Sequence, residues 1–364
     1  LSVKVLPYSA ASFNMPKIEV AKTPAIMARL NRYRSAEHPL FLSASSIKLY
    51  LGCPMSFYFE MVARYRREDK NNEWIDESTF GTIVHDVFEK LFDLQLEKSP
   101  GGALITSDVL ESMRSDRILL DRLICRAVNE FFRNLGKECY TPLNGETKII
   151  GYIIRENVRE VLRKEQQLTP FVYLHGEWQK DGVLRLQGSE GKAFSVNFTC
   201  RVDRVDMLKD ASTFERMRII DYKTGSDEIH APGIEAMLHD YKCKAFAQVM
   251  LYSQAYAQFL PYSGPIQPMV YSMRKLMVQP VSPLTTGQQP TSEQIEHEEY
   301  KSPDKGSKRW KILDYRDYLT EFNDALIPYR EALFNPDVPF VCADDDAACT
   351  YCEFKAICQR HLKK

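Results

Sequence analysis

The chain has 364 residues, and its formal net charge is −1 because 48 Lys and Arg residues oppose 49 Asp and Glu residues. This balance excludes a general polyanion binder, since nonspecific affinity for nucleic acid comes from Lys and Arg that displace counterions; any nucleic-acid site has to be a local basic groove. There is no run of about 18 apolar residues to span a membrane. Nine cysteines are too few for a disulfide scaffold of this size, so we expect a reducing cytoplasm.

The first elements in chain order are an arm and a capped helix. Residues 1–40 contain several prolines and little periodicity, and we expect a linker or an arm. In "LSASSIKLYLGCPMSFYFEMV", Ser43 or Ser45 can cap a helix. Pro54 breaks or restarts that helix directly after Cys53.

Three amphipathic helices are predicted next, over 78–98, 107–134 and 147–166, and they place a helical insertion at about 99–166. In "FGTIVHDVFEKLF" an apolar stripe with helical spacing faces the core, and it comprises Val84, Val87, Phe88, Leu91 and Phe92. His85 lies at the edge of this stripe. By itself, a histidine in this position is more often a packed or surface residue than a metal ligand.

Between residues 171 and 223 the period changes to two, which predicts strands. In "FSVNFTCRVDRVD" apolar residues alternate with polar ones, and Asp203 falls on the polar face. In "RIIDYKTG", Asp221 and Lys223 project from one face. If the two runs form an antiparallel hairpin centred on residue 212, Asp203 and Asp221 lie opposite one another, with β-carbons about 4.5–5.5 Å apart.

Two carboxylates at that separation suit one hard divalent cation. Mg²⁺ takes one or two carboxylates and keeps positions for water and substrate phosphate. Lys223 beside them can orient or deprotonate the attacking water, or neutralise charge that develops on the phosphate. This set is the minimum for hydrolysing a phosphodiester. The alternative interpretation is a solvated ion pair, which is the commoner origin of an isolated D-x-K on a strand.

The remaining predicted elements are a helix, a strand, a loop and a helix, at 234–260, 268–276, 280–309 and 312–333. Gln248 and Tyr252 are four residues apart and share a face of the first of these helices. The loop contains "YKSPDKGSKRWK", whose basic residues around Trp310 suit single-stranded nucleic acid. A solvated loop explains this cluster at least as well.

Three cysteines in "CTYCEFKAIC", Cys349, Cys352 and Cys358, have a C-x2-C-x5-C spacing. Zinc sites and iron–sulfur clusters usually have four thiolates. The spacing leaves both kinds of site open and does not identify the fourth ligand, although C-x2-C is more often a zinc motif.

Taken in order, these segments resemble the RecB-like branch of the PD-(D/E)XK nuclease superfamily. The resemblance rests on "LSASSIKLYLGCPMSFYFE", "GTIVHDVFE", "RVDRVD", "IIDYKTG", "QVMLY" and the closing cysteines, over about residues 42–358. Within that branch, the sequence is similar to the C-terminal nuclease domain of AddB-type (RexB-type) subunits of bacterial helicase–nucleases. The implied fold class is α/β, with a restriction-endonuclease-like mixed sheet flanked by helices, a helical insertion and a C-terminal iron–sulfur clasp, all within a nuclease domain at 41–364.

The resemblance also implies a role for each motif residue. The implied metal ligands are His85, Asp203, Asp221 and the carbonyl of Tyr222. Lys223 corresponds to the catalytic lysine, and Gln248 and Tyr252 to a helix motif that supports the site and contacts DNA. Glu177, in "HGEWQ", is either an auxiliary carboxylate near the metal or a solvated residue at a strand edge.

For the cysteines, the resemblance implies a [4Fe–4S] cluster, with zinc as the alternative occupant. The implied ligands are Cys53, Cys349, Cys352 and Cys358. Cys53 precedes the other three by almost the whole chain, so the cluster would close a long loop, and its binding would add to folding stability. We expect the cluster to be structural and to help grip DNA, because hydrolysis requires no redox step.

The implied function is a Mg²⁺- or Mn²⁺-dependent DNA exonuclease domain that acts in double-strand break repair and recombination. Its partners would be DNA and an AddA-like helicase–nuclease subunit, at the nucleoid of a bacterial cytoplasm. The sequence has no G-x-x-x-x-G-K-[ST] motif, and because it starts at Leu1 we expect it to be part of a longer polypeptide. The alternatives are a metal-stapled DNA-binding or assembly module with an inactive nuclease fold, and a free-standing RecB-like exonuclease.

Overall fold

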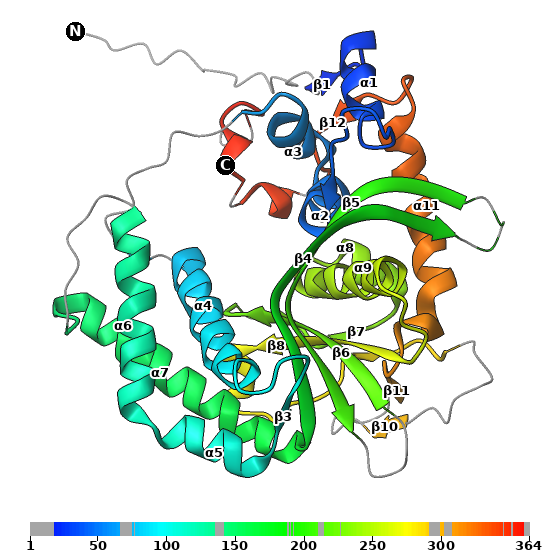
Figure 1. Cartoon of the computed structure of the whole chain (residues 1–364). Helices are drawn as coiled ribbons and strands as arrows, with labels where there is room; N and C mark the ends of the chain where they lie inside the picture. Colours follow the sequence, from blue (N-terminus) through cyan, green and yellow to red (C-terminus); the bar gives the residue numbers. More distant parts are fainter. Residues whose placement is uncertain are drawn as a thin grey trace, which may run out of the picture.

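The computed structural model describes residues 18–65, 75, 77–134, 142–187, 189, 191, 193–209, 215–225, 227–290, 299–301, 308–344, 346–350 and 352–359. The protein is of the mixed α/β class, with a central mixed sheet flanked by helices (Figure 1). This architecture confirms the coarse fold class expected from the sequence. Among the described helices, none is long and apolar enough to cross a membrane.

The central sheet has six strands and combines parallel with antiparallel pairs. Its order is β3-β4-β5-β6-β8, and β2 pairs with β5 outside this path. The strands are β2 (Leu42–Ser43), β3 (Ala103–Ile105), β4 (Phe171–Gln187), β5 (Ala193–Lys209), β6 (Glu215–Lys223) and β8 (Ile266–Ser272). Strands β4, β5 and β6 are antiparallel neighbours. Strands β6 and β8 are parallel, as a crossover through helix α9 (Lys244–Phe259) allows.

The β5–β6 hairpin has the register that the sequence predicts. Arg204 pairs with Ile220, and the pairs that follow run as far as Lys209 with Glu215. Alternation of apolar and polar residues fixes such a register, because a slip of one residue would turn every apolar side chain to the opposite face. One step beyond Arg204 and Ile220, the same register brings Asp203 toward Asp221.

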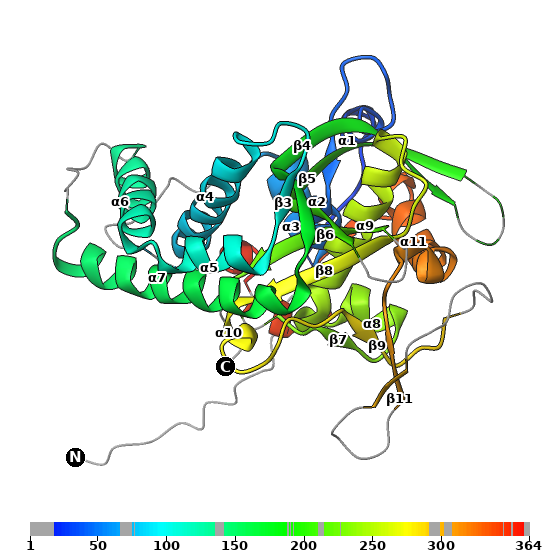
Figure 2. The ribbon, with the colours of Figure 1, turned by 60° about the horizontal axis from the view of Figure 1, so that its bottom comes forward.

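Helices cover both faces of the sheet, and each face has its own hydrophobic core. On one face α9 packs with α2 (Ala44–Gly52), α8 (Ile234–His239) and, through α8, α11 (Leu319–Phe334). On the other face lie α4 (Glu77–Leu96), α5 (Ser107–Ser115), α6 (Arg117–Asn134) and α7 (Gly145–Glu165). Both ribbon views separate these two layers (Figures 1 and 2).

The segment that begins at Leu42 has the helix cap that the sequence predicts. The Ser43 hydroxyl oxygen accepts a hydrogen bond from the Ser46 backbone N–H at 3.1 Å and so caps α2. Helix α2 ends at Gly52, and α3 (Pro54–Phe57) begins directly after Cys53. A π-helical turn (Tyr58–Val62) follows α3.

Two helices that the sequence predicts as continuous are interrupted at aspartates. The helix expected over 107–134 is split into α5 and α6 at Asp116, whose Oδ1 accepts from the Leu119 backbone N–H at 2.9 Å. The helix expected over 234–260 is split at Asp240, whose Oδ1 accepts from the Lys242 N–H at 2.8 Å. Aspartate side chains compete in this way with the helical backbone for its own donors.

The segment expected as a linker or an arm holds regular structure where it is described. Strand β1 (Glu19–Val20) pairs with β12 (Phe340–Val341) near the other end of the chain. Helix α1 (Pro24–Asn31) follows, and Leu30 and Tyr33 are buried in the core. Apolar anchoring therefore attaches residues 18–40 to the domain.

Short elements complete the fold. A second sheet has the order β10-β11-β9-β7, formed by β7 (His230–Ala231), β9 (Thr285–Thr286), β10 (Glu299–Lys301) and β11 (Lys308–Lys311). The stretch predicted as a loop over 280–309 thus contributes strands, while Lys305 of its basic cluster lies outside the described residues. Helix α10 (Met273–Leu276) replaces the end of the strand predicted over 268–276. The 3-10 turns are Gln166–Leu168, Tyr241–Cys243, Tyr315–Tyr318, Asp346–Cys349 and Glu353–Lys355.

Candidate metal centre

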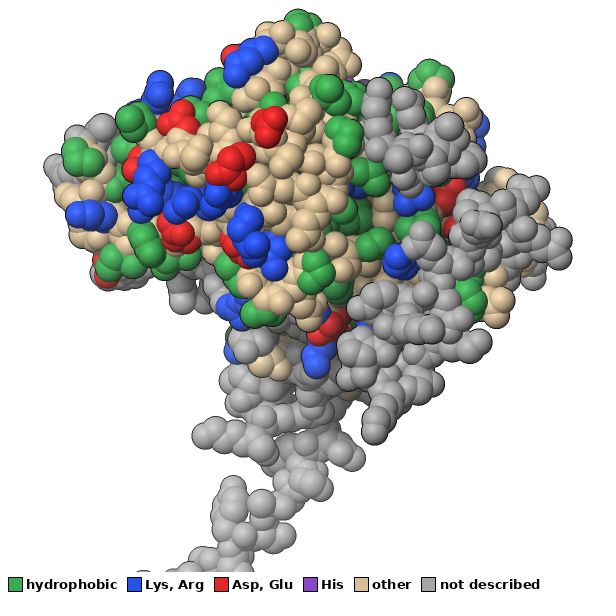
Figure 3. Space-filling model, turned by 90° about the horizontal axis from the view of Figure 1, so that it is seen from below, with side chains coloured by type: hydrophobic (Ala, Val, Ile, Leu, Met, Phe, Trp, Pro, Cys, Tyr) green, Lys and Arg blue, Asp and Glu red, His purple; other side chains and the backbone are tan. Residues whose placement is uncertain are grey.

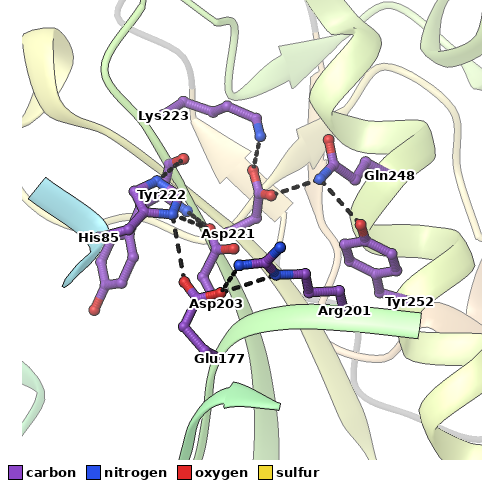
Figure 4. Close-up of polar contacts among 9 residues, drawn as sticks. All are labelled: His85, Glu177, Arg201, Asp203, Asp221, Tyr222, Lys223, Gln248 and Tyr252. Atoms are coloured by element: carbon purple, nitrogen blue, oxygen red, sulfur yellow. Dashed lines mark hydrogen bonds and ion pairs between the residues drawn. The ribbon is translucent and has the colours of Figure 1, made fainter. Parts of the chain in front are cut away.

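Five elements bring polar side chains together where the two helical layers meet the central strands (Figure 4). Helix α4 provides His85, β4 provides Glu177 and β5 provides Asp203. Strand β6 provides Asp221, Tyr222 and Lys223, and α9 provides Gln248 and Tyr252.

His85, Glu177 and Asp203 form a group with the donor set of a divalent-cation site. One ligand atom from each side chain lies within 4.8 Å of the others. His85 Nδ1 is 3.5 Å from Asp203 Oδ2 and 3.7 Å from Glu177 Oε1. Two carboxylates and an imidazole suit Mg²⁺ or Mn²⁺ in the hardness of their donor atoms. This group can therefore hold a divalent metal ion.

Backbone contacts fix the orientation of two of these side chains. His85 Nε2 lies 3.0 Å from the Tyr222 carbonyl oxygen. Because a carbonyl only accepts, Nε2 carries a proton, and Nδ1 is the ring nitrogen that faces the two carboxylates and would be free to bind a metal ion in the neutral ring. The Tyr222 backbone N–H donates to Asp203 Oδ2 at 2.7 Å. Tyr222 thus orients His85 and Asp203 through its backbone, and its carbonyl as a metal ligand stays a prediction.

Glu177 is the side chain that sequence reasoning left undecided between metal site and solvated edge. Its backbone has a φ of +42°, a value that non-glycine residues rarely adopt. Glu177 lies close to an irregularity in the β4–β5 pairing, where the register shifts between Tyr173 and His175. Strain of this kind collects at functional sites. Arg201, on β5, ion-pairs with Glu177 at 2.8 Å, and the Glu177 side chain is only 16 % exposed, so the carboxylate lies within the site rather than in bulk solvent.

Asp221 is buried, and its two oxygens have different partners. Lys223 Nζ lies 2.7 Å from Oδ2, and Gln248 Nε2 donates to Oδ1 at 2.8 Å. Gln248 also lies 3.4 Å from the Tyr252 hydroxyl. The side chains of Gln248 and Tyr252 are themselves buried, which suits them to hold Asp221 in place rather than to contact DNA directly.

Burial and like charge shift the protonation of the group. Burial, with repulsion by Asp221, raises the pKa of Asp203 to about 7. Burial lowers the pKa of His85, but the hydrogen bond with Glu177 and the charge of Asp203 outweigh it, and the net shift is upward. For Lys223, burial also lowers the pKa, and the Asp221 and Asp203 carboxylates reverse the sign. Repulsion among carboxylates is the electrostatic condition that a bound cation relieves.

Beneath this group lies a buried ionic network that the sequence does not reveal. Arg204 Nη2 and Arg218 Nη2 lie 2.6 Å and 2.8 Å from Asp206 Oδ2, and Arg204 Nη1 lies 2.8 Å from Glu165 of α7. Arg204 also donates to the Tyr222 hydroxyl at 3.2 Å. The network thus connects the helical layer, β5 and β6 to the tyrosine that orients His85 and Asp203.

The cysteines come from both ends of the described chain toward one region. The Ala343 backbone N–H donates to Cys53 Sγ at 3.4 Å, and Ser56 Oγ lies 3.5 Å from Cys352 Sγ. Burial, with a contact to Cys342 and the nearby thiols of Cys53 and Cys352, raises the pKa of Cys358 to about 12.

These thiols do not form a closed ligand set. Sulfur atoms around one zinc ion lie roughly 3.8 Å apart, as bonds of about 2.3 Å in a tetrahedron require. Within the part of the chain that the structure describes, no three cysteine sulfurs lie within 4.8 Å of one another. The described cysteines are therefore not arranged around one zinc ion. This distance does not test a [4Fe–4S] cluster, whose thiolates bind separate irons, and such a cluster is not confirmed.

The surface of the helical layer carries paired charges. Arg114 of α5 pairs with Glu111, and Arg163 of α7 with Glu160, each at 2.6 Å. On the face seen in Figure 3, Lys and Arg side chains lie beside Asp and Glu side chains. The face in view is thus mixed in charge, in keeping with the net charge of −1.

The family model of the PD-(D/E)XK nuclease superfamily matches residues 41–359. No curated protein is significantly similar to the chain. The matched range contains every residue of the metal centre described above and all four cysteines expected in the clasp.

Proposed function

This chain belongs to the PD-(D/E)XK nuclease superfamily, and from that membership we propose that it is a metal-dependent DNA exonuclease domain. The observation that carries the proposal is the meeting of His85, Glu177 and Asp203 from three separate elements, with Asp221 and Lys223 beside them. The group combines one imidazole nitrogen with two carboxylates from three elements, which is a donor set that divalent cations bind. A site for Mg²⁺ or Mn²⁺ explains that arrangement.

A divalent cation bound there would polarise the scissile phosphate and lower the pKa of the attacking water. His85, Glu177 and Asp203 would hold it, with Asp221 as a further ligand. The chain's own groups then orient the reactants. Gln248 keeps Asp221 in position through a 2.8 Å hydrogen bond, with Tyr252 behind it.

Lys223 is assigned the role of catalytic lysine. Its ammonium lies 2.7 Å from Asp221 Oδ2 and remains partly accessible to solvent. From this position it can donate a hydrogen bond to the water or to a phosphate oxygen and balance the charge that develops in the transition state. The raised pKa of Lys223 is consistent with a cation that holds negative charge.

The wider assignment is an AddB-like (RexB-like) nuclease domain over residues 41–364, with the helical insertion at about 99–166. In this assignment the chain acts in double-strand break repair and recombination with an AddA-like subunit. The order of the motifs supports it, together with the approach of Cys53 to the C-terminal cysteines. A [4Fe–4S] cluster at Cys53, Cys349, Cys352 and Cys358 is part of the same proposal.

The test is cleavage of linear single- and double-stranded DNA by the purified chain with Mg²⁺. We expect the wild-type protein to shorten end-labelled strands, and Lys223→Ala and Glu177→Gln each to lower the rate by about 100-fold or more, because each removes transition-state or metal stabilisation. Lys98→Ala, an exposed lysine at the end of the α4 region, is the matched control and should keep the wild-type rate. Equal rates for Lys223→Ala and wild type, or no metal-dependent cleavage, would contradict the proposal.

A further inference from the structure

A pocket of about 350 Å³ lies beside the metal centre, between the helical layer and the end of β6. Its walls come from the start of α4, the middle of α7, the residues after β6 and the region of α10. Helix α10 packs against α7, and Figure 2 shows it below the end of that helix. The pocket is therefore assembled from four segments far apart in the sequence.

The walls combine apolar surfaces with a few polar groups. Phe80, Ile153, Met273 and Met277 contribute the apolar part. The polar part comprises Asn157, Thr224 and Arg274. Flat π systems with a polar edge require such a mixture, because apolar walls contact their faces and amides or hydroxyls satisfy their edges. A nucleobase linked to a phosphate is a ligand of this kind, and a guanidinium at the mouth adds a partner for the phosphate.

The pocket adjoins the site of the proposed chemistry. Thr224 directly follows Lys223, and Gly81 approaches Thr224 so closely that an added Cβ would meet its Oγ1 at 3.3 Å. Phe80 precedes His85 by five residues, which is about 7.5 Å along a helix. A strand whose phosphate lies at the metal centre can therefore place a neighbouring nucleotide at the pocket.

We propose that this pocket binds the base of one unpaired nucleotide of the DNA strand whose phosphate lies at the metal centre. The inference rests on the proposed nuclease function and deepens it. A base in a duplex hides its faces and its pairing edge, so only an unpaired nucleotide can present both to these walls. The pocket would make the enzyme act on single-stranded or unwound ends. It also supplies affinity through stacking in a protein that lacks an excess of positive charge.

The first test measures binding of a fluorescently labelled oligothymidylate to the full chain in EDTA, by anisotropy. Met277→Glu should weaken binding about 5-fold or more, since it places a carboxylate in the pocket and since loss of one stacked base has an effect of that size. Val278→Glu is the matched control, because Val278 is 79 % exposed and does not line the pocket. It makes the same charge change one residue away and should bind like wild type.

The second test uses oligonucleotides that carry a single abasic nucleotide at successive positions from one end. The wild-type protein should lose affinity at one position, where the missing base would have entered the pocket. Phe80→Ala should bind all of these oligonucleotides with similar, lowered affinity, because the stacking surface is already absent. Thermal melting of each variant confirms that it is folded.

Two outcomes distinguish a failure of the pocket proposal from a failure of the nuclease proposal. If the wild-type protein cleaves DNA but Met277→Glu and Val278→Glu bind it equally well, or if the abasic series is flat, the pocket assignment is overturned and the nuclease function stands. If the wild-type protein neither binds nor cleaves DNA with Mg²⁺, both proposals fall.

Discussion

The Asp203 carboxylate, which would help to bind a metal ion, lowers the stability of the metal-free folded protein when it is charged. Burial and the charge of Asp221 raise its pKa from 3.8 to about 7 in the folded protein. Between these two values the folded state binds more protons than the unfolded state, so the free energy of unfolding falls as the pH rises through this range. Above pH 7 the metal-free protein carries the full cost of the charged carboxylate, which a bound cation offsets.

We therefore expect Asp203→Asn to be more stable than the wild-type protein at pH 8 in EDTA. At pH 4 the difference should be small, because the wild-type carboxyl group is then protonated in the folded state. Urea denaturation at several pH values measures both effects. Asp108→Asn, at an exposed position on α5, should follow the wild-type pH dependence. Parallel pH profiles for wild type and Asp203→Asn would show that Asp203 is not destabilised by its surroundings.

With Mg²⁺ present, we expect the wild-type protein to be more stable than Asp203→Asn, the reverse of the order in EDTA. Mg²⁺ at millimolar concentration is expected to stabilise the wild-type protein, because it binds the folded state in preference to the unfolded one. It should leave Asp203→Asn nearly unchanged, since that variant lacks one carboxylate of the group. The residue would then account for both the instability of the metal-free protein and its response to metal.

At the scale of elements, the ionic network joins α7 to β5 and β6 beneath the metal centre. Glu165 and Asp206 are fully buried, and so are Arg204 and Arg218, so the two acids and two bases compensate one another. Removal of one partner leaves an uncompensated charge in the interior, which typically costs about 3–5 kcal/mol. Helix α7 is therefore bound to the sheet by charge as well as by apolar packing.

We expect Glu165→Ala to lower the free energy of unfolding by about 3–5 kcal/mol. It should also weaken metal affinity, because Arg204 would be free to shift and Tyr222 orients both His85 and Asp203. Urea denaturation and Mn²⁺ titration calorimetry measure the two effects. Arg163→Ala on the surface of the same helix should change both very little. If Glu165→Ala lost no stability, the network would not be a structural link.

Secondary structure was predictable from the sequence where the alternation or periodicity of a whole segment determines it. It was harder to predict where the hydrogen bonds of a single side chain end a helix. The alternation in β5 and β6 gave the hairpin register, because one wrong step would expose the apolar face. The breaks at Asp116 and Asp240 were not predicted. An aspartate within an amphipathic pattern looks like a surface residue of the helix until its carboxylate is seen to accept backbone hydrogen bonds.

At the scale of the whole molecule, the two ends of the described chain meet. Strand β1 pairs with β12, Lys22 donates to the Asn335 carbonyl at 3.1 Å, and Cys53 lies against Ala343. Phe59 and Phe354 have ring centroids 5.1 Å apart. A metal centre at the cysteines would add a covalent closure to contacts that already hold the ends together.

We expect anaerobically purified protein to contain about four iron and four sulfide per chain and little zinc, as a [4Fe–4S] centre requires. Cys53→Ala should lose that content and unfold at a lower temperature, because metal binding is coupled to folding. Cys125→Ala, on α6 and outside the clasp, is the control and should retain it. Full metal content in Cys53→Ala would refute the four-cysteine site, and zinc in place of iron would identify the alternative occupant.

Local sequence patterns were enough to predict the hairpin that brings Asp203 toward Asp221 and the two-residue spacing that sets Lys223 beside Asp221. These features depend on periodicity and on residues close together in the chain. Three features became visible only in the folded chain: Glu177 joins His85 and Asp203, Tyr222 orients them, and Glu165 and Arg218 share one network. The tertiary structure alone assembled the pocket beside Thr224. The reason is physical: contacts between distant segments depend on how twisted strands and packed helices approach one another, and local sequence patterns do not encode those distances.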